Sequence, residues 1–509
     1  MAKNMKKLLA LLLVVALAAT CFTACSGDGK KKVNIRDIYT DVDINLSYAF
    51  WEDGDIFEKI YQDWLAKYPN ITIDPVEFPT GTFTESLKAL FAANDAPDIF
   101  GIIGGPDFAI ENGMLLDMTL LWENDDDAKK VIRGINDFRI GYFSTDYKWA
   151  TPIKFYPAAA FINKNLIIED LNMEMPDPDW TWEDYEEFIT DVSDGKKVDG
   201  YKVFGTTGDG GCLTVTWYPI MSDGECIGEF GWTEKDGGSY DMENWAVGMN
   251  LQAQWAKDGI YYEQGNADYR TETYGSADIY PQDQGHVAVE CCWWYTFARY
   301  FDNDQGEQKM LENGVVYVPY MQPHLESVAK EDYTYIATMD IGGINSSCGE
   351  YAVEAYEALK YFTWGAEGWK AKLKYYPEML EDGVDYGVAG AKYGSNFPIN
   401  LDDEVWEAYR ALWAGADDPY GRGEYFDDFF DRVKAARWTC LGAPQIPGFE
   451  TWLNDFYFLE DFEGSGQYAG IEAAVLQGGV DASAHYQELQ EAGNAYFEEK
   501  IGEIEVMLQ

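Results

Sequence analysis

The sequence predicts α/β domains that are followed by a helical layer at the C-terminal end. Residues 71–78 alternate apolar and polar side chains as a strand does. Residues 82–94 place Leu87, Leu90 and Phe91 on one helical face, and the apolar run at 96–103 is typical of a buried parallel strand. A strand, a helix and a strand within about thirty residues form a right-handed crossover unit. With 509 residues, the chain is long enough for two domains or more.

The other elements follow the same reasoning along the chain. Thr181 and Asp184 form the capping-box pattern that opens a helix ending at Val192. By periodicity, we expect strands at 42–50, 154–163, 203–206, 284–290 and 314–319, with a strand or turn at 340–345. We expect helices at 55–68, 114–121, 128–143, 241–257 and 349–364, and the C-terminal layer at 404–414, 426–437 and 484–501.

The composition excludes several classes of partner. A net charge of -52 argues against binding to nucleic acid or to an anionic membrane surface. The 18 Trp and 36 Tyr exceed what a core needs, so some rings are available to line a groove. Only three histidines are present and no two cysteines have C-x-x-C spacing, so no metal site and no cofactor are expected. An EF-hand-like spacing begins at Asp41, but Leu46 replaces the required glycine and the segment alternates as a strand.

The N-terminal leader has the features of a secretory signal. Lys3, Lys6 and Lys7 precede an apolar run at 8–19 that is too short to span a bilayer. The sequence Phe22-Thr-Ala-Cys25 then resembles the lipobox of bacterial lipoproteins, although leucine is more usual at the position of Phe22. We therefore expect a signal peptide at 1–24, a lipid on Cys25 and a flexible tether at 25–33. This resemblance implies anchoring to the outer face of a bacterial cell membrane.

Four stretches, in this order, resemble one protein family. They contain Leu90-Phe-Ala-Ala-Asn-Asp-Ala-Pro-Asp-Ile-Phe100; Ala160-Phe-Ile-Asn-Lys-Asn-Leu166 with Trp180-Thr-Trp-Glu-Asp-Tyr185; Gly285-His-Val-Ala-Val-Glu290 with Trp293; and Gly342-Gly-Ile344 with the helix to Phe362. This series is similar to family 1 of the extracellular solute-binding proteins, the maltose-binding-like carbohydrate-binding proteins of ABC importers. The resemblance covers most of residues 34–364 and is weaker beyond Gly394.

This resemblance implies a two-lobed periplasmic-binding-protein type II fold. Lobe I would comprise 34–155 plus about 319–395, and lobe II 156–318 plus about 396–509. The chain would cross the hinge near Phe155–Tyr156, Val318–Pro319 and Asn396–Phe397. A monomer would bind a solute between its lobes, close around it and deliver it to the permease of an ABC transporter.

The candidate ligand-binding residues lie in loops and at the expected hinge. Aromatic rings cover the apolar faces of a sugar, and carboxylates bind its hydroxyl groups. Trp293 matches the stacking tryptophan of the family, whereas Trp294 is expected in the core. Packing, helix capping or turn formation would explain each residue equally simply. The candidates are Trp51, Glu52, Asp53, Gly104, Asp107, Tyr156, Asp209, Trp293 and Trp452.

Two alternatives stay open at this point. A surface-anchored glycoside hydrolase would need two carboxylates at a set separation, and any two of 89 acidic residues could provide them. However, the chain has no G-x-S-x-G, H-E-x-x-H or P-loop pattern, and we do not expect an enzyme. A glycan-binding protein without a transporter is the second alternative. A sugar is the expected ligand, with peptides and polyamines also open.

Overall fold

The computed structural model describes residues 35–51, 53–103, 107–135, 148–208, 217–219, 226, 228–233, 237–298, 314–328, 333–379, 396–413, 421–439, 446–458 and 470–508. Within these residues, a nine-stranded sheet has the order β2-β1-β3-β12-β4-β10-β7, with β11 on β4 and β13 on β12. The strands are β1 (Ile44–Phe50), β2 (Ile71–Glu77), β3 (Ile99–Ile102), β4 (Thr151–Asn163), β7 (Phe204–Gly208), β10 (Val287–Trp293), β11 (Tyr317–Tyr320), β12 (Thr334–Ile344) and β13 (Arg437–Thr439).

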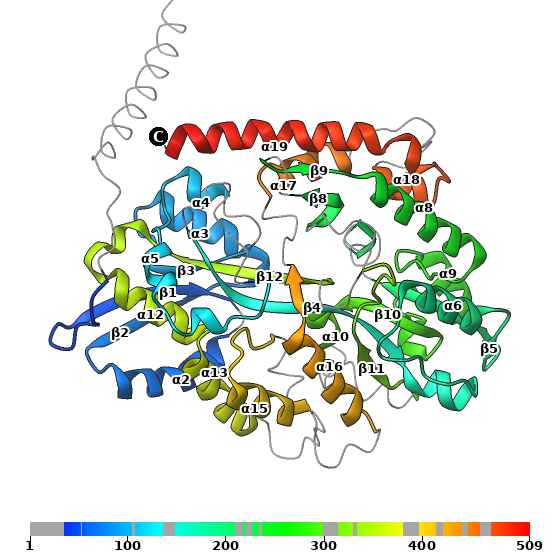
Figure 1. Ribbon diagram of the computed structural model, residues 1–509, viewed down its shortest axis with the longest axis horizontal. Coiled ribbons are helices and arrows are strands. Elements are labelled where there is room, and N and C mark those ends of the chain that lie inside the picture. The colour runs from blue at the N-terminus through cyan, green and yellow to red at the C-terminus, as the bar shows by residue number, and fades with distance from the viewer. Residues whose placement is uncertain are drawn as a thin grey trace, which may run out of the picture.

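Strand β4 joins two halves of this sheet. Its residues 151–157 pair with β12, and its residues 158–163 pair with β10 and β11. All 13 residues of β4 are buried, as expected of a strand that is covered on both faces. We call β2, β1, β3 and β12 the first half of the sheet, and β10, β11 and β7 the second half. Figure 1 shows β4 running from one half to the other through the centre of the molecule.

Helices flank both halves. Beside the first half lie α2 (Gly54–Lys67), α3 (Phe83–Ala92), α4 (Asp107–Glu111), α5 (Thr119–Glu123), α12 (Ala352–Phe362) and α13 (Ala366–Tyr375). Beside the second half lie α6 (Trp182–Ser193), α8 (Glu243–Asp258), α9 (Ala267–Tyr274) and α10 (Trp294–Ala298). Helices α15 (Asp403–Trp413) and α16 (Gly423–Ala435) lie below β4 in Figure 1. The hairpins β5 (Lys197–Val198)–β6 (Tyr201–Lys202) and β8 (Trp232–Thr233)–β9 (Ser239–Tyr240) are separate small sheets.

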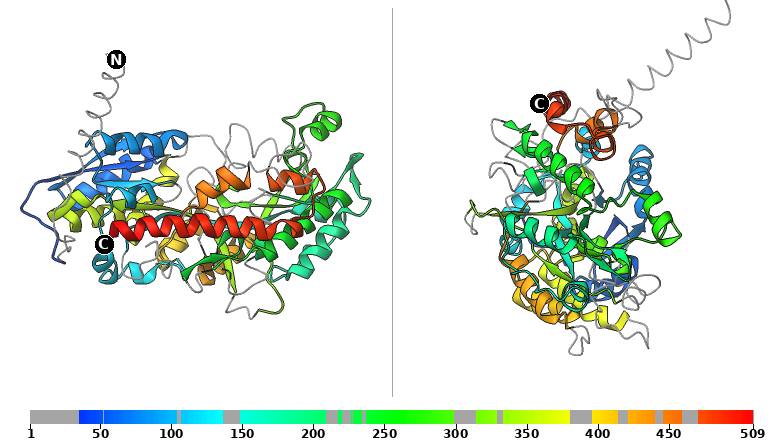
Figure 2. Two further views of the ribbon diagram at one scale, coloured as in Figure 1. Left: turned by 90° about the horizontal axis from the view of Figure 1, so that it is seen from above. Right: turned by 90° about the vertical axis from the view of Figure 1, so that its right-hand side faces the viewer.

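The last helix connects two hydrophobic clusters. The larger cluster extends through both halves of the main sheet. The smaller cluster holds Leu489 and Phe497 of α19 (Tyr486–Leu508) with residues of β8, β9, α8, α17 (Phe449–Trp452) and α18 (Ile471–Leu476). Near its other end, α19 contacts α4, and Ile504 joins the larger cluster. Figures 1 and 2 show α19 lying along one face of the molecule, across elements of both halves.

The predicted crossover unit is confirmed as β2, α3 and β3. Both strands pair in parallel with β1, which lies between them in the sheet. The capping box is also confirmed, because Thr181 Oγ1 accepts from the amide of Asp184 at 3.1 Å and Asp184 Oδ2 accepts from the amide of Thr181 at 2.8 Å. The C-terminal helices α15, α16 and α19 agree with the predicted amphipathic runs to within a few residues at their starts.

Three boundaries differ from the predictions. The helix predicted at 114–121 begins only at Thr119, because Leu115 forms a bridge with Asn345, the residue that follows β12. At 128–143, the structure has a short 3-10 helix at Ala128–Lys130, and residues beyond 135 lie outside the described part. The strand or turn predicted at 340–345 is the end of the much longer β12, since pairing with β4 extends it.

The chain returns to the first half of the sheet after β11. Val318 and Pro319 still pair with Ile162 and Phe161 of β4 in the second half, so the return lies between Tyr320 and Thr334. Residues 396–397 lie against the predicted first crossing at Phe155. The side-chain oxygen of Asn396 accepts a hydrogen bond from the amide of Phe155 at 2.8 Å, and the amide of Phe397 donates to the carbonyl of Phe155 at 3.0 Å.

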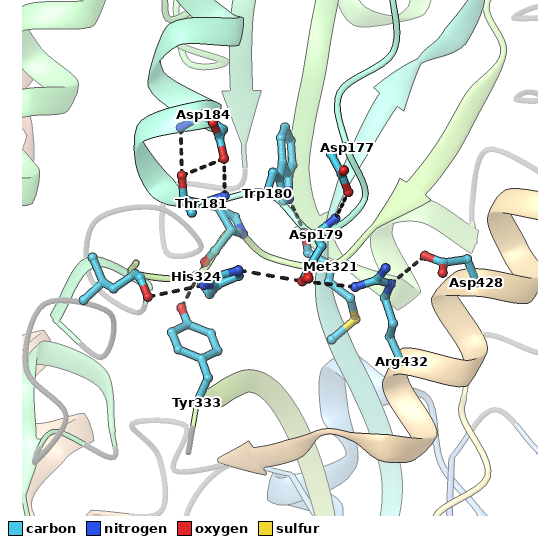
Figure 3. A network of polar contacts seen from close by, with 12 residues as sticks. Asp177, Asp179, Trp180, Thr181, Asp184, Met321, His324, Tyr333, Asp428 and Arg432 are labelled. Atoms are coloured by element: carbon cyan, nitrogen blue, oxygen red, sulfur yellow. Dashed lines mark hydrogen bonds and ion pairs between the residues drawn. The ribbon is translucent and has the colours of Figure 1, made fainter. Parts of the chain in front are cut away.

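A polar network holds the returning segment (Figure 3). The indole of Trp180 donates to the carbonyl of Met321 at 2.9 Å, and the hydroxyl of Tyr333 donates to the carbonyl of Pro323 at 3.0 Å. Asp179 then lies 3.7 Å from His324 Nε2 and 3.4 Å from Arg432 of α16. The network therefore fastens the segment between β11 and β12 to the start of α6 and to α16.

Two further findings concern the described helices and cysteines. Within the described residues, none of the helices combines the length and apolar character needed to span a membrane. Cys226, Cys291, Cys292 and Cys348 are buried, and the adjacent Cys291 and Cys292 of β10 serve as small core residues. Cys25 lies outside the described residues.

Candidate ligand-binding site

The crossing strand β4 brings polar and aromatic candidates onto one face of the sheet. Successive side chains of a strand point to opposite faces, so Lys154, Tyr156 and Ala158 share one face. Trp293 lies directly opposite Ala158 in β10, which places its side chain on that same face. Two candidates that are far apart in sequence, Tyr156 and Trp293, therefore lie diagonally across the junction of the two halves.

Three aromatic residues gather at this junction, Tyr156, Trp293 and Tyr295, and we call them the aromatic cluster. The ring of Tyr156 lies 5.2 Å from that of Tyr295 in an edge-on arrangement of 81°. Tyr156 and Trp293 are 8% and 9% exposed, whereas Tyr295 is 44% exposed. Tyr295 is thus the ring of this cluster that offers a broad surface to a ligand. The sequence reasoning missed Tyr295, although its position two residues beyond Trp293, just past a strand end, could have indicated it.

The two tryptophans at the end of β10 have different surroundings. Trp293 is the last residue of β10, and α10 begins at Trp294. Trp294 is fully buried and stacks on Phe429 at 5.4 Å with an angle of 8° between the rings. The prediction that Trp294 belongs to the core is confirmed.

The loop after β1 places Trp51 inside the protein and Asp53 at its surface. Trp51 is 3% exposed, packs edge-on against Phe83 at 4.7 Å and lies so close to Gly101 that a Cβ there would overlap the ring. Trp51 therefore packs the core in this conformation. Asp53 is 42% exposed through its side chain and forms a 3.3 Å ion pair with Lys154.

The remaining candidates divide into two groups. Trp452 is fully buried in the smaller cluster, 5.2 Å from Phe230 and 5.3 Å from Tyr240, so it offers no surface to a ligand. The packing interpretation explains Trp452, because α17 lies beneath α19. Asp107 begins α4, at the carboxyl end of β3 as predicted, but its side chain lies outside the described residues, as do Glu52, Gly104 and Asp209.

Charges cluster where the first half meets β4. Lys154 is 6% exposed, donates to the carbonyl of Trp51 at 3.2 Å and lies over its ring at 4.8 Å. Lys372 of α13 is 4% exposed, and burial lowers the pKa of its ammonium group. Burial, with a smaller contribution from the charge of Asp53, raises the pKa of the hydroxyls of Tyr48 and Tyr376. This arrangement can bind a polar ligand next to aromatic rings. Among the described residues, no group of His, Cys, Asp and Glu is arranged to hold a metal ion.

Comparison with known proteins gives a result at the level of the fold. No family model and no curated protein matches the sequence. Similar structures include an ABC substrate-binding protein from Listeria monocytogenes in complex with cycloalternan, with a TM-score of 0.58, 13% identity, and coverage of 89% of this chain and 98% of that one. A sugar transporter protein from Rhizobium etli in an open conformation has a TM-score of 0.61 and 13% identity, covering 89% and 99%.

A third structure is similar over the same extent. The extracellular solute-binding protein from Staphylococcus aureus in complex with maltose has a TM-score of 0.56 and 13% identity, and the match covers 91% of this chain and 99% of that one. These matches span nearly the whole of each solved protein, and they agree with the two sheet halves that β4 joins. The chain has the two-lobed periplasmic-binding-protein fold of the extracellular solute-binding proteins.

Proposed function

We propose that this protein binds a mono- or oligosaccharide between its two lobes and delivers it to the permease of an ABC transporter. The observation that carries this proposal is the cluster of Tyr156, Trp293 and Tyr295 at the junction of the two halves. In a two-lobed binding protein, a ligand at this place can contact both lobes. Aromatic rings suit the apolar face of a sugar, and structures with the same fold were solved with cycloalternan and maltose.

Further contacts would come from the loops around the cluster. Asp53 is exposed and able to accept hydrogen bonds from sugar hydroxyls. Glu52, Gly104, Asp107 and Asp209 are proposed as additional ligand contacts, because the carboxyl ends of strands are where ligands bind in α/β sheets.

The lobes are proposed to follow the halves of the sheet. Lobe I would comprise 34–155 plus about 334–395, and lobe II 156–333 plus about 396–509, so that the second boundary follows the observed pairing of β11. Residues 155–156 and 396–397, together with the segment between β11 and β12, would form the hinge.

The leader supports a location outside the cytoplasm. The signal-like residues 1–24 and the lipobox-like Cys25 point to a lipoprotein on the outer face of the cell membrane. We propose that the protein acts there as a monomer, as a binding protein without catalytic turnover.

A thermal-shift screen against sugars, amino acids, peptides and polyamines tests this function. A sugar at about 100 times its Kd stabilises the folded protein by roughly 2.7 kcal/mol, and it should be recovered unchanged. Uptake of the same sugar in cells that express the protein and its permease should depend on binding. Consumption of the sugar would instead indicate a glycosidase, and stabilisation by a polyamine or peptide alone would refute the sugar assignment.

A further inference from the structure

Lys372 is a buried ammonium group for which the described residues provide no polar partner. It lies on α13, its exposed fraction is 4%, and it forms no hydrogen bond and no ion pair with a described residue. Its described contact is with the ring of Trp369, 5.3 Å away. Burying a charged amine without a partner is costly, and such groups in native proteins call for an explanation.

Lys372 lies near one carboxylate and one further ammonium group. Burial lowers the pKa of the Lys372 ammonium group most, the charge of Asp53 raises this pKa, and the charge of Lys154 lowers it. Asp53 is already paired with Lys154 at 3.3 Å, and Lys372 forms no ion pair with a described residue, in a chain whose net charge is -52.

The start of α2 offers backbone amides, although its first turn also carries Asp55. This 14-residue helix begins at Gly54, directly after Asp53, and has no side-chain cap. The free amides of a first helical turn favour anions. Two more carboxylates border the region: the exposed Glu77 beside Gly54, and Asp340, which lies opposite Lys154 in β12 and has contacts of its own.

We propose that the ligand of this protein is an acidic sugar, whose carboxylate or phosphate group binds Lys372 and Lys154 beside the start of α2. This inference rests on the proposed function and specifies its class of ligand. Lys154 shares a sheet face with Tyr156 and Trp293, so one ligand can place its ring against the aromatic cluster and its anionic group toward the lysines. Charge-assisted hydrogen bonds from two buried ammonium groups would favour the acidic over the neutral sugar.

Calorimetric titration of the purified protein tests this inference. The probes are glucuronate and galacturonate with their short oligomers, glucose 6-phosphate, and the matching neutral sugars. We expect the acidic sugars to bind at least tenfold more tightly than their neutral counterparts. Uronates and the sugar phosphate distinguish a carboxylate from a phosphate as the recognised group.

A pair of variants locates the binding group. Lys372→Met should weaken binding of the acidic sugar at least tenfold and leave neutral-sugar binding unchanged. Lys374→Met is the control, because Lys374 lies on the same helix and forms an exposed ion pair with Asp63. If Lys372→Met fails to fold, the preference of the wild-type protein for acidic sugars still decides the question.

The outcomes separate the two proposals. Tight binding of neutral sugars without a preference for acidic ones would overturn the inference and leave the proposed function intact. Equal affinities of the wild-type and Lys372→Met proteins for the acidic sugar would also overturn it. Binding of no sugar of either kind would overturn the proposed function itself.

Discussion

Replacing Tyr295 by alanine should weaken sugar binding with little effect on stability. The ring is 44% exposed, so a sugar face can cover it. Covering about 60–100 Å² of apolar surface contributes roughly 1.5–2.5 kcal/mol, which corresponds to about a 10- to 70-fold increase in Kd upon substitution. The edge-on contact with Tyr156 contributes about 0.5–1.5 kcal/mol to stability, so the loss in unfolding free energy should stay near 1 kcal/mol.

Calorimetry with the sugar that gives the largest thermal shift measures this effect. Tyr201→Ala is a matched control, because Tyr201 is 38% exposed, stacks on Tyr274 at 5.2 Å and lies on β6 of the separate β5–β6 hairpin. We expect an unchanged Kd for the control and a similar, small change in Tm for both variants. If Tyr295→Ala binds as tightly as the wild type, the aromatic cluster does not contact the ligand, and the site must be sought elsewhere.

Three further predictions concern stability. Trp294→Ala should cost about 3–5 kcal/mol in a denaturant titration, because it removes a buried ring that stacks on Phe429, and a loss below 1 kcal/mol would contradict its core role. Burial raises the pKa of Glu472, so its contribution to stability is fully present below the ordinary value of 4.5 and is lost as the pH rises through the folded value. Glu472→Gln should therefore raise Tm at pH 8 but not at pH 4, and an equal effect at both would refute this. Ile504→Ala should speed proteolysis at the end of α19, whereas Val506→Ala, at a 74% exposed position, should not.

The sequence predicts well where local signals are strong. The crossover unit and the capping box at Thr181 depend on periodicity and on contacts within a few residues, and both appear as expected. The predicted helix from Met114 is wrong because Leu115 pairs with Asn345, more than two hundred residues away. Such a contact has no local signature, and it overrides the helical pattern.

The candidate site also depends on contacts between residues that are far apart in the sequence, which local patterns do not reveal. Trp51 and Trp452 look suitable for ligand stacking by residue type, but their burial depends on Gly101 and on the packing beneath α19. Conversely, the sequence signal for Tyr295 is only its position just past the end of β10, and its exposure depends on where that strand ends. The charge cluster of Lys154 and Lys372 is also invisible in the sequence, since these residues are more than two hundred positions apart.

The contacts of β4 and α19 restrict how the proposed lobes could close. Both backbone groups of Phe155 bond to residues 396–397, so these two crossings should move together as one unit. Helix α19 is anchored in the smaller cluster by Phe497, and Ile504 packs into the larger cluster where α19 contacts α4, just beyond β3. A hinge motion that moves α4 relative to the second half must either carry the end of α19 with it or release Ile504. Since α4 follows the strand end where a ligand is proposed to bind, the packing of Ile504 should influence the balance between open and closed forms as well as the stability of the helix.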